Sequence, residues 1–519
     1  MLLAACSMQI HAPTISHDPK RQNKPWRIHC ETARTHAPHS KDVPATAKSK
    51  WIFAQDTEGK KLAFEGKVVD GFFEVDAVHN PSSGRLVPSR LTVRQLCIDT
   101  IEMKRGNSKL MLGWVMAVRS GEKVNIPPVY PDEMASGDEV TRVVVFGDSL
   151  TDTGRLKHRL KIFPAKPYWI GRFSNGPVWP EYLAMATGMG VQNHAYGGAS
   201  ASVHDAQPGV NFYARIKEVG QFFVTGTIKL QIDDYIQRTL ADGSIERADT
   251  TAFLLWAGAN DYISKEPVTG IITTFLNSPE GESGYRPVVE LVVAQLVQHV
   301  RTLYDAGARK FVVMNLPDLG LTPIVLQNKT YTPKYEKADD SARRIELARR
   351  LTELSLYHNQ LLKKDMNHLE KLLAGSEILL ADTFGFFHKL LEADGAVGSS
   401  PQQYGYDLAL LEKTLEYEDS SLSVQQRCYR GSYMGRVNTD KICSEPGKAV
   451  FWDAVHPTTL THCWQAWKVG QVMAGAAWTD HLPDSSEYLG WCQQVVQHVT
   501  SKSLGHFVTR QANPDSQVP

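Results

Sequence analysis

The sequence predicts an α/β protein with a central parallel sheet, preceded by a small all-β domain. From residue 141 onward, short apolar runs without polar alternation are separated by helical stretches. Before that point, residues 51–120 contain short β-prone runs separated by turn residues. With 519 residues, 42% of them hydrophobic and 22% charged, the chain has ordinary globular composition and can bury a large core.

Charge and hydropathy exclude several classes of protein. Lys+Arg and Asp+Glu number 56 each, so the formal net charge is zero and a nucleic-acid partner is not expected. The sequence contains no apolar run long enough for a transmembrane helix. Its composition also excludes collagen-like and wholly disordered chains.

Residues 1–50 are rich in His, Pro, Thr and Lys and show no periodicity, so we expect an extended or disordered segment. Leu3-Ala4-Ala5-Cys6 is similar to the end of a bacterial lipoprotein signal, but only five residues precede Cys6 and none is basic. A truncated signal and a chance match both remain open.

The small all-β domain is expected over residues 51–120, followed by a linker at 121–140 that is rich in Pro, acidic and small residues. Turn residues separate its β-prone runs, which are Trp51–Phe53, Lys61–Phe64, Phe72–Val75 and Met111–Val115.

The parallel sheet is expected within residues 141–478. Its strands are the apolar runs Arg142–Phe146, Phe253–Ala257, Lys310–Met314 and Ile378–Ala381. Helices are expected at 286–306 and 341–373, and in the second of these leucines recur on one face. Strands that are apolar on both sides indicate a sheet covered on both faces, and ligands of such sheets bind at the carboxyl ends of the strands. Residues 479–519 form a C-terminal extension with no predicted role.

Four polar segments lie at or near such strand ends or turns. In the first, Phe146–Gly154, Ser149 follows a strand in a tight glycine-containing turn before a helix, where a serine can be exposed. The alternative is that Asp148 or Ser149 merely caps that helix. In the second, Asn193–Ser200, adjacent glycines allow a backbone N–H to approach a ligand, although an ordinary turn would look the same.

The third segment, Gly258–Asp261, places Asn260 where its amide could donate to a developing oxyanion, or where it simply forms a turn. In the fourth, Trp452–Thr458, Asp453 precedes His456 by three residues and could fix the imidazole tautomer that acts as a base. Each segment alone is a weak signal, whereas the four in this order are a strong one.

Together the four segments resemble blocks I, II, III and V of the SGNH or GDSL hydrolase family, over about residues 141–475. The resemblance implies a three-layer sandwich, with Ser149 as nucleophile and Asp453 and His456 as triad acid and base. It implies an oxyanion hole made by Ser149, Gly198 and Asn260. No cofactor and no metal are implied, because the triad supplies the chemistry itself, and His462 is expected to be structural.

Further elements narrow the resemblance to a lipolytic branch that includes bacterial thermolabile hemolysins (lecithinases) and glycerophospholipid–cholesterol acyltransferases. They are Gly171–Trp179 (GRFSNGPVW), Asn315–Asp318 (NLPD), Phe451–Thr459 (FWDAVHPTT) and, in the N-terminal part, Trp51–Gly59 and Thr92–Cys97. The sequence departs from the branch at Arg155, where Asn is commoner, and in its tail.

Two disulfides are expected. Cys428 and Cys443 bracket a short polar loop, although two unrelated thiols would also fit, and the lipolytic branch supports their pairing. A Cys30–Cys97 bridge is implied by the resemblance alone. If bridges form, the protein works in an oxidising compartment, and the branch implies a secreted or cell-surface protein.

The function implied is a serine esterase acting on glycerophospholipids or lysophospholipids, with water or cholesterol as acyl acceptor and a phospholipid membrane as partner. Phe163, Tyr168 and Trp169 lie in an apolar segment that could contact the acyl chain, or could pack a long loop on the core. Alternatives are a carbohydrate or other non-lipid esterase of the same fold, a membrane-binding protein with a vestigial site, and lipid binding by residues 51–120 alone.

Overall fold

The structure is a computed structural model. It describes residues 24–34, 50–70, 72–88, 93–104, 110–119, 140–160, 164–165, 167–169, 171–187, 189–201, 227–240, 242–263, 285–326, 341–391, 404–406, 427–429, 442–443, 445–479 and 482–500.

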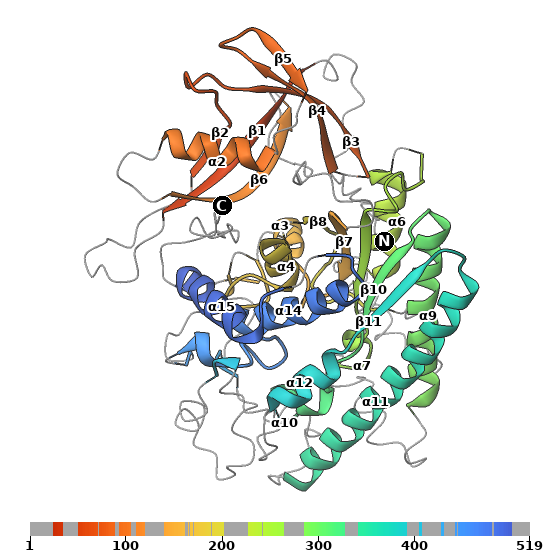
Figure 1. Cartoon of the computed structure of the whole chain (residues 1–519). Helices are drawn as coiled ribbons and strands as arrows, with labels where there is room; N and C mark the ends of the chain where they lie inside the picture. Colours follow the sequence, from red (N-terminus) through yellow and green to blue (C-terminus); the bar gives the residue numbers. More distant parts are fainter. Residues whose placement is uncertain are drawn as a thin grey trace, which may run out of the picture.

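A five-stranded parallel sheet forms the centre of the larger part of the molecule (Figure 1). Its strands, in the order β11-β10-β9-β7-β8, are Glu377–Ala381, Lys310–Met314, Thr251–Trp256, Arg142–Gly147 and Gly190–Asn193. Every residue of β7 and β9 is buried. The predicted α/β class is therefore confirmed, and all four predicted strands lie in this sheet.

Both faces of the sheet are covered by helices, which gives three layers. Val144 and Phe146 of β7 belong to one core cluster, which continues into helices α6 (Ile228–Asp234), α9 (Arg286–Asp305) and α11 (Ser341–Leu372). The intervening residues Val143 and Val145 belong to a second cluster on the opposite face, because side chains of a strand alternate in direction. That second cluster includes residues of helices α4 (Trp179–Thr187), α12 (Thr383–Leu391), α14 (Thr459–Gly475) and α15 (Ser485–Thr500).

Short helices follow several strands or join the longer elements: α3 (Arg155–Leu160), α7 (Ala259–Tyr262), α10 (Pro323–Leu326), the π-helical turn Tyr235–Thr239 and the 3-10 turns Leu319–Leu321 and Pro446–Lys448. Helix α7 directly follows β9, with Gly258 between them at φ +124°. This backbone conformation favours glycine and lets the chain turn sharply at the carboxyl end of the strand.

The N-terminal part is an antiparallel sheet with strands β1 (Trp26–Arg34), β2 (Lys50–Phe53), β3 (Ala63–Val69), β4 (Phe72–Asn80), β5 (Arg85–Pro88) and β6 (Leu110–Arg119). Two expectations were wrong here. Residues 26–34 are not irregular, because Trp26, Ile28 and Cys30 alternate into the core of this sheet. The domain is not all-β either, since Val93–Met103 form helix α2, which buries Leu96, Cys97 and Ile101 against it.

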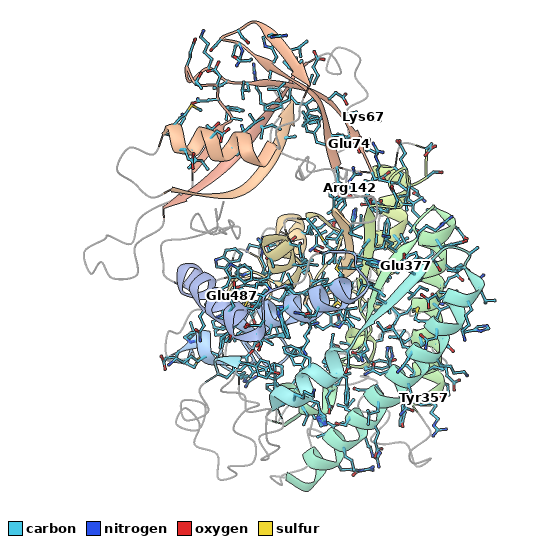
Figure 2. All side chains as sticks on the ribbon, in the orientation of Figure 1. Lys67, Glu74, Arg142, Tyr357, Glu377 and Glu487 are labelled. Carbon is cyan, nitrogen blue, oxygen red and sulfur yellow. A yellow bond between two sulfur atoms is a disulfide. The ribbon has the colours of Figure 1, made fainter. Side chains whose placement is uncertain are left out.

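The segment between β3 and β4 joins the N-terminal sheet to the parallel-sheet domain. Phe72 lies in the core cluster of the parallel-sheet domain, and Asp70 accepts hydrogen bonds from the backbone N–H groups of Glu246 (3.2 Å) and Arg247 (3.0 Å). Figure 2 shows Glu74 and Arg142 at this junction, and their side chains form an ion pair at 2.6 Å. The two parts therefore share both core and charge contacts.

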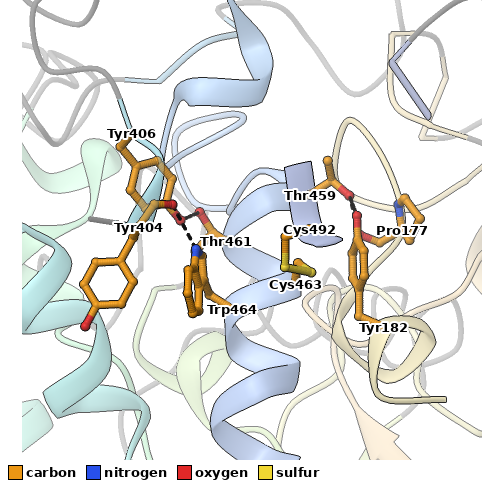
Figure 3. Close-up of a disulfide and its surroundings, with 9 residues drawn as sticks. All are labelled: Pro177, Tyr182, Tyr404, Tyr406, Thr459, Thr461, Cys463, Trp464 and Cys492. Atoms are coloured by element: carbon orange, nitrogen blue, oxygen red, sulfur yellow. Dashed lines mark hydrogen bonds between the residues drawn. A yellow bond between two sulfur atoms is a disulfide. The ribbon is translucent and has the colours of Figure 1, made fainter. Parts of the chain in front are cut away.

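Within the C-terminal extension, residues 482–500 pack into the core. Helix α15 lies against α14, and a disulfide joins Cys463 of α14 to Cys492 of α15 (Figure 3). Tyr488 and Cys492 are fully buried in the same cluster as Trp464. The sequence did not reveal this pairing. Most of the expected linker at 121–140, and residues beyond 500, lie outside the described residues.

Candidate active site

Ser149 lies in a tight turn immediately after strand β7. Thr151 and Asp152 donate their N–H groups to the Asp148 carbonyl (3.1 and 2.9 Å), which closes the turn. Gly147 is required at the strand end, because a Cβ there would come within 2.7–2.9 Å of Thr151 and of the Trp256 carbonyl. Ser149 is thereby held at the carboxyl edge of the sheet with 8% of its surface exposed.

Gln231 of helix α6 fixes this strand end, a role that the sequence did not predict. Its amide accepts a hydrogen bond from the Gly147 N–H (3.0 Å) and donates one to the Gly147 carbonyl (2.9 Å). Both backbone groups next to the Ser149 turn are thus satisfied by one buried side chain. A glutamine on an otherwise amphipathic helix gives no recognisable signal in the sequence.

The structure brings Ser149, His456 and Asp453 into one hydrogen-bonded chain. His456 Nε2 lies 2.8 Å from Ser149 Oγ, and His456 Nδ1 lies 2.8 Å from Asp453 Oδ2. All three side chains are at least nine-tenths buried. A hydroxyl, an imidazole and a carboxylate in this order can generate an oxygen nucleophile.

The turn that carries Asp453 and His456 is closed on itself. Trp452 donates its N–H to the His456 carbonyl (2.8 Å), and Asp453 Oδ1 accepts the N–H groups of Val455 and His456, both at 2.8 Å. Burial alone would raise the pKa of Asp453, but the charge and hydrogen bonds of His456 and the Tyr168 hydroxyl hold that pKa well below its ordinary value. Asp453 is therefore a carboxylate.

The segment Gly171–Trp179, which the sequence marked only as a family signature, clamps this turn in place. Ser174 Oγ donates to the Pro457 carbonyl (2.9 Å), and Asn175 Oδ1 accepts the Thr459 N–H (2.8 Å). Gly176 lies directly against Thr459, where a Cβ would meet side-chain atoms at 2.4–2.9 Å. The motif therefore anchors the start of α14 and the residues just after His456.

The three residues expected to contact substrate have different outcomes. Tyr168 is buried, with 3% exposed, and its hydroxyl donates to Asp453 Oδ2 at 2.7 Å, so it faces the carboxylate and not an open acyl groove. Trp169 is half-buried against the second core cluster with Arg172 over its ring at 4.9 Å, and its substrate contact stays a prediction. Phe163 lies outside the described residues.

The expected oxyanion donors lie around Ser149, but Asn260 is already engaged. Gly198 adopts φ +82°, and neither its N–H nor that of Ser149 has an acceptor among the described residues. The Asn260 amide donates to the Ala199 carbonyl (2.9 Å) and to Asp148 Oδ2 (3.3 Å). The two backbone N–H groups are thus unpaired within the described residues, and the oxyanion hole of Ser149, Gly198 and Asn260 stays a prediction.

Buried carboxyl groups hold the loops around Ser149. Asp152 Oδ2 accepts the Gly197 N–H and Asp261 Oδ2 accepts the Ala201 N–H, each at 2.8 Å. Burial, together with the nearby charges of Asp261 and Asp152, raises the pKa of Asp148 to about 7. Carboxyl groups shielded from water therefore lie on both sides of Ser149 in the sequence, at Asp148 and Asp152.

No cluster of three or more His, Cys, Asp or Glu side chains suited to a metal ion occurs in the described part of the chain. His462 is buried, burial lowers its pKa to about 3, and neither ring nitrogen has a hydrogen-bond partner within the described ranges. None of the helices among those ranges is long and apolar enough to span a membrane.

Both expected disulfides, Cys30–Cys97 and Cys428–Cys443, are formed in the structure, in addition to Cys463–Cys492. Cys30 lies on β1 and Cys97 on α2, so this bridge ties helix to sheet within the N-terminal part. Disulfides of this kind persist in oxidising compartments, which indicates an extracellular protein.

The three-layer fold and the serine site define an esterase or lipase class of protein. The family model for GDSL-like lipase/acylhydrolase matches residues 143–468, well over half of the chain, and the chain belongs to this family. The resemblance drawn from the four sequence segments is thereby confirmed.

Relatives extend the similarity beyond the family domain. The chain is 27% identical to the thermolabile hemolysin of Vibrio parahaemolyticus over 435 residues, which cover 83% of this chain and 84% of that protein. It is 27% identical to the phosphatidylcholine-sterol acyltransferase of Aeromonas hydrophila over 341 residues, or 62% of this chain and 87% of the relative. A secreted effector protein of Salmonella typhimurium is 27% identical over 53% of this chain and 55% of its own length.

Proposed function

We propose that this chain is a serine esterase that hydrolyses acyl esters of glycerophospholipids or lysophospholipids through an acyl-enzyme on Ser149. The observation that carries the proposal is the 2.8 Å contact of His456 Nε2 with Ser149 Oγ, with Asp453 behind the imidazole. Ser149 Oγ therefore has a base beside it and unpaired backbone N–H groups nearby, as a nucleophile in acyl transfer requires.

The reaction follows from this geometry. Ser149 Oγ attacks the ester carbonyl and passes its proton to His456 Nε2, while the Asp453 carboxylate stabilises the imidazolium. The N–H groups of Ser149 and Gly198 stabilise the tetrahedral oxyanion, with the Asn260 amide as a third donor once it turns from the Ala199 carbonyl. His456 then protonates the leaving alcohol, and the same residue activates the acceptor that releases the acyl group.

The lipid substrate is supported by the relatives. One is named a hemolysin and another a phosphatidylcholine-sterol acyltransferase, and both align with this chain over more than four-fifths of their own length. Water is the general acceptor of the acyl group, and the second name favours a sterol as an additional acceptor. With its disulfides, the protein fits secretion or display at the cell surface, where a phospholipid membrane is its partner.

The test compares purified wild type with Ser149→Ala on phosphatidylcholine liposomes that contain cholesterol, followed by separation of the lipids. We expect free fatty acid and lysolipid from the wild type only, and cholesteryl ester if the sterol is an acceptor. Loss of Ser149 should lower the rate by about 10⁴-fold or more, as for other serine triads.

Wild-type rates in folded Ser149→Ala would refute the acyl-enzyme on Ser149. Ser149-dependent release of acetate from acetylated polysaccharide, with no lipid product, would instead identify a carbohydrate esterase of the same fold. Liposome binding without any Ser149-dependent product would indicate a membrane-binding protein with a vestigial site.

A further inference from the structure

We propose that Tyr168 is a positioning residue for the proposed reaction, acting on Ser149 and His456 through the carboxylate of Asp453. This inference rests on the function proposed above and adds a fourth side chain to its machinery. Tyr168 Oη donates to Asp453 Oδ2 at 2.7 Å, and the two residues are 285 positions apart in the sequence. Both side chains are buried.

The two oxygens of Asp453 are held in different ways. Oδ1 accepts the backbone N–H groups of Val455 and His456, which belong to the same short turn. Both oxygens face His456 Nδ1, Oδ1 at 2.9 Å and Oδ2 at 2.8 Å, and Oδ2 also accepts from Tyr168 at 2.7 Å. Tyr168 is thus a donor from outside the turn, and it fixes the oxygen that the backbone N–H groups of the turn do not hold. Without it, the turn alone determines how the carboxylate plane is oriented.

The ring of Tyr168 is itself fixed by what we call the aromatic box, which consists of Phe173, Tyr429 and Trp452. Edge-on contacts join the Tyr168 ring to all three, with centroids 6.2, 5.5 and 6.3 Å away. Within the box, the Tyr429 ring stacks on the Trp452 ring, with centroids 5.5 Å apart. Trp452 is the residue directly before Asp453. A phenol enclosed in this way keeps its hydroxyl on one acceptor, because few rotamers are open to it.

Backbone contacts link the aromatic box to the Cys428–Cys443 disulfide. Tyr429 donates its N–H to the Trp452 carbonyl (2.5 Å), and its neighbour Cys428 is bonded to Cys443. The 167–169 segment is held from its own side, since Tyr168 donates its N–H to the Ala165 carbonyl (3.0 Å) and Trp169 to that of Ser174 (2.9 Å). The hydroxyl therefore bridges two separately anchored segments.

The hydroxyl has two effects on the reaction. It fixes the carboxylate plane so that both oxygens stay within reach of Nδ1, which keeps Nε2 directed at Ser149. It also takes up part of the negative charge on Oδ2, because a charge-assisted hydrogen bond draws charge toward the donor. Without the hydroxyl, more negative charge faces the imidazole and stabilises the imidazolium more strongly.

The experiment uses the full-length protein and a soluble p-nitrophenyl ester as well as phosphatidylcholine liposomes. Tyr168→Phe removes the hydroxyl and keeps the ring. We expect kcat to fall about 10- to 100-fold, as for loss of a hydrogen bond to a charged group, with KM within about twofold. The acidic limb of the kcat/KM profile should move to higher pH. A variant that merely packs badly would not shift that limb.

Tyr406→Phe is the matched control. Tyr406 is also a buried tyrosine, and its hydroxyl bonds to Thr461 at 2.8 Å, away from Asp453 (Figure 3). Its removal should leave kcat, KM and the pH profile at wild-type values. Wild-type kcat together with a wild-type pH profile in folded Tyr168→Phe would overturn the inference.

A double-mutant cycle with Asp453→Asn separates action through Asp453 from action elsewhere. If Tyr168 works through the carboxylate, its removal costs much less in the Asp453→Asn background than in the wild type. Equal fold losses in both backgrounds would refute the positioning role. Ser149→Ala keeps the two proposals apart: if ester hydrolysis does not depend on Ser149, the proposed function fails first, whereas Ser149-dependent hydrolysis with an unaffected Tyr168→Phe refutes this inference alone.

Discussion

The carboxylate of Asp152 accepts a 2.8 Å hydrogen bond from the backbone N–H of Gly197. Asp152 ends the turn that carries Ser149, and Gly197 precedes Gly198, so this contact joins the two segments whose N–H groups we propose as oxyanion donors. The same carboxylate accepts the N–H groups of Arg155 (2.6 Å) and Leu156 (3.1 Å) at the start of helix α3. One buried side chain thus sets the spacing between two donors.

Asp152→Asn should lower kcat more than it lowers stability. The amide keeps one acceptor oxygen for the helix and presents an NH₂ group to the other N–H donors, which displaces Gly197 and with it Gly198. Because loss of one oxyanion donor raises a barrier by roughly 3–4 kcal/mol, we expect kcat to fall by about 100- to 1,000-fold, with a loss of about 1–2 kcal/mol in unfolding free energy for the weakened cap. Steady-state kinetics and urea denaturation measure the two effects.

Asp318→Asn is the control for this prediction. Asp318 is also buried and caps a short helical turn through the Gly320 N–H (3.0 Å), but it lies outside the serine site. The Asp318→Asn variant should be less stable than the wild type and have the same kcat. If Asp152→Asn behaves in the same way, the carboxylate is only a helix cap.

Gly176→Ala should destabilise the protein and impair the site, because the new methyl group would overlap Thr459 at the start of α14. Overpacking of this kind costs about 1–3 kcal/mol, and relief by movement of α14 would displace His456 from Ser149. Gly475→Ala is the control, since nothing lies within 4 Å of a Cβ added there. Thermal unfolding and esterase assays of both variants test this, and equal behaviour of the two would contradict the clamp.

The sequence predicted the proposed reacting residues of the candidate site better than the residues that hold them in place. Ser149 and Asn260 could be found because short polar motifs follow strands of the parallel sheet, whose carboxyl ends meet at one edge. Asp453 and His456 follow no strand of that sheet and were found through their spacing and the family resemblance. Gln231 and Tyr168 could not, since each acts on a segment far away in the chain. Tyr168 in particular lies among apolar residues, which favoured a substrate groove until the structure placed its hydroxyl on Asp453.

The N-terminal sheet shows a different limit. Strand β1 was missed because the composition of residues 1–50 as a whole obscures the short alternation of Trp26, Ile28 and Cys30. Helix α2 was read only as part of a family motif, since an isolated 11-residue helix has little intrinsic signal and is stabilised by packing. The Cys463–Cys492 pairing was not predicted, because neither the spacing of these cysteines nor the family resemblance pointed to it.

Glu74→Gln should weaken the attachment of the N-terminal sheet. Glu74 pairs with Arg142, whose side chain is 4% exposed, and with Arg247, which is 46% exposed. Burial opposes its ionisation, but the hydrogen bonds from Arg247 and Arg142 lower the pKa of Glu74 to about 2. Without the charge of Glu74, the buried Arg142 guanidinium loses the carboxylate that pairs with it. We therefore expect a loss of about 2–4 kcal/mol in unfolding free energy at pH 7.

The pH dependence of that loss follows from the sign of the shift. The folded-state pKa lies below the ordinary 4.5, so the contribution of Glu74 is full above about pH 5 and disappears as the pH falls toward 2. The deficit of Glu74→Gln should therefore shrink in acid. Glu58→Gln removes an exposed pair with Lys60, which water screens, and should leave stability close to that of the wild type at every pH. A Glu74 deficit that is independent of pH would contradict this assignment.

Asp148→Asn should alter the pH dependence of stability in the opposite direction. Burial and the nearby charges of Asp261 and Asp152 raise the pKa of Asp148 from 3.8 to about 7 in the folded protein. Between these values the unfolded chain releases this proton and the folded chain keeps it, so unfolding becomes easier as the pH rises from about 4 to 7 and levels off above. The asparagine variant lacks this loss. Relative to wild type, its unfolding free energy should therefore improve between about pH 4 and pH 7 and then stay constant up to pH 8 in urea titrations.

Asp484→Asn provides the control for this last test. Asp484 is a cap at the start of α15, and hydrogen bonds from Glu487 and Ser486 lower its pKa, so it is ionised in both folded and unfolded chains above about pH 5. Its variant should differ from wild type by a constant amount between pH 5 and 8. If the Asp148→Asn difference is constant as well, Asp148 is ionised in the folded protein. The carboxylate that accepts from Asn260 would then be a permanent charge beside Ser149, stabilised by the Leu150 N–H and the Asn260 amide despite its burial.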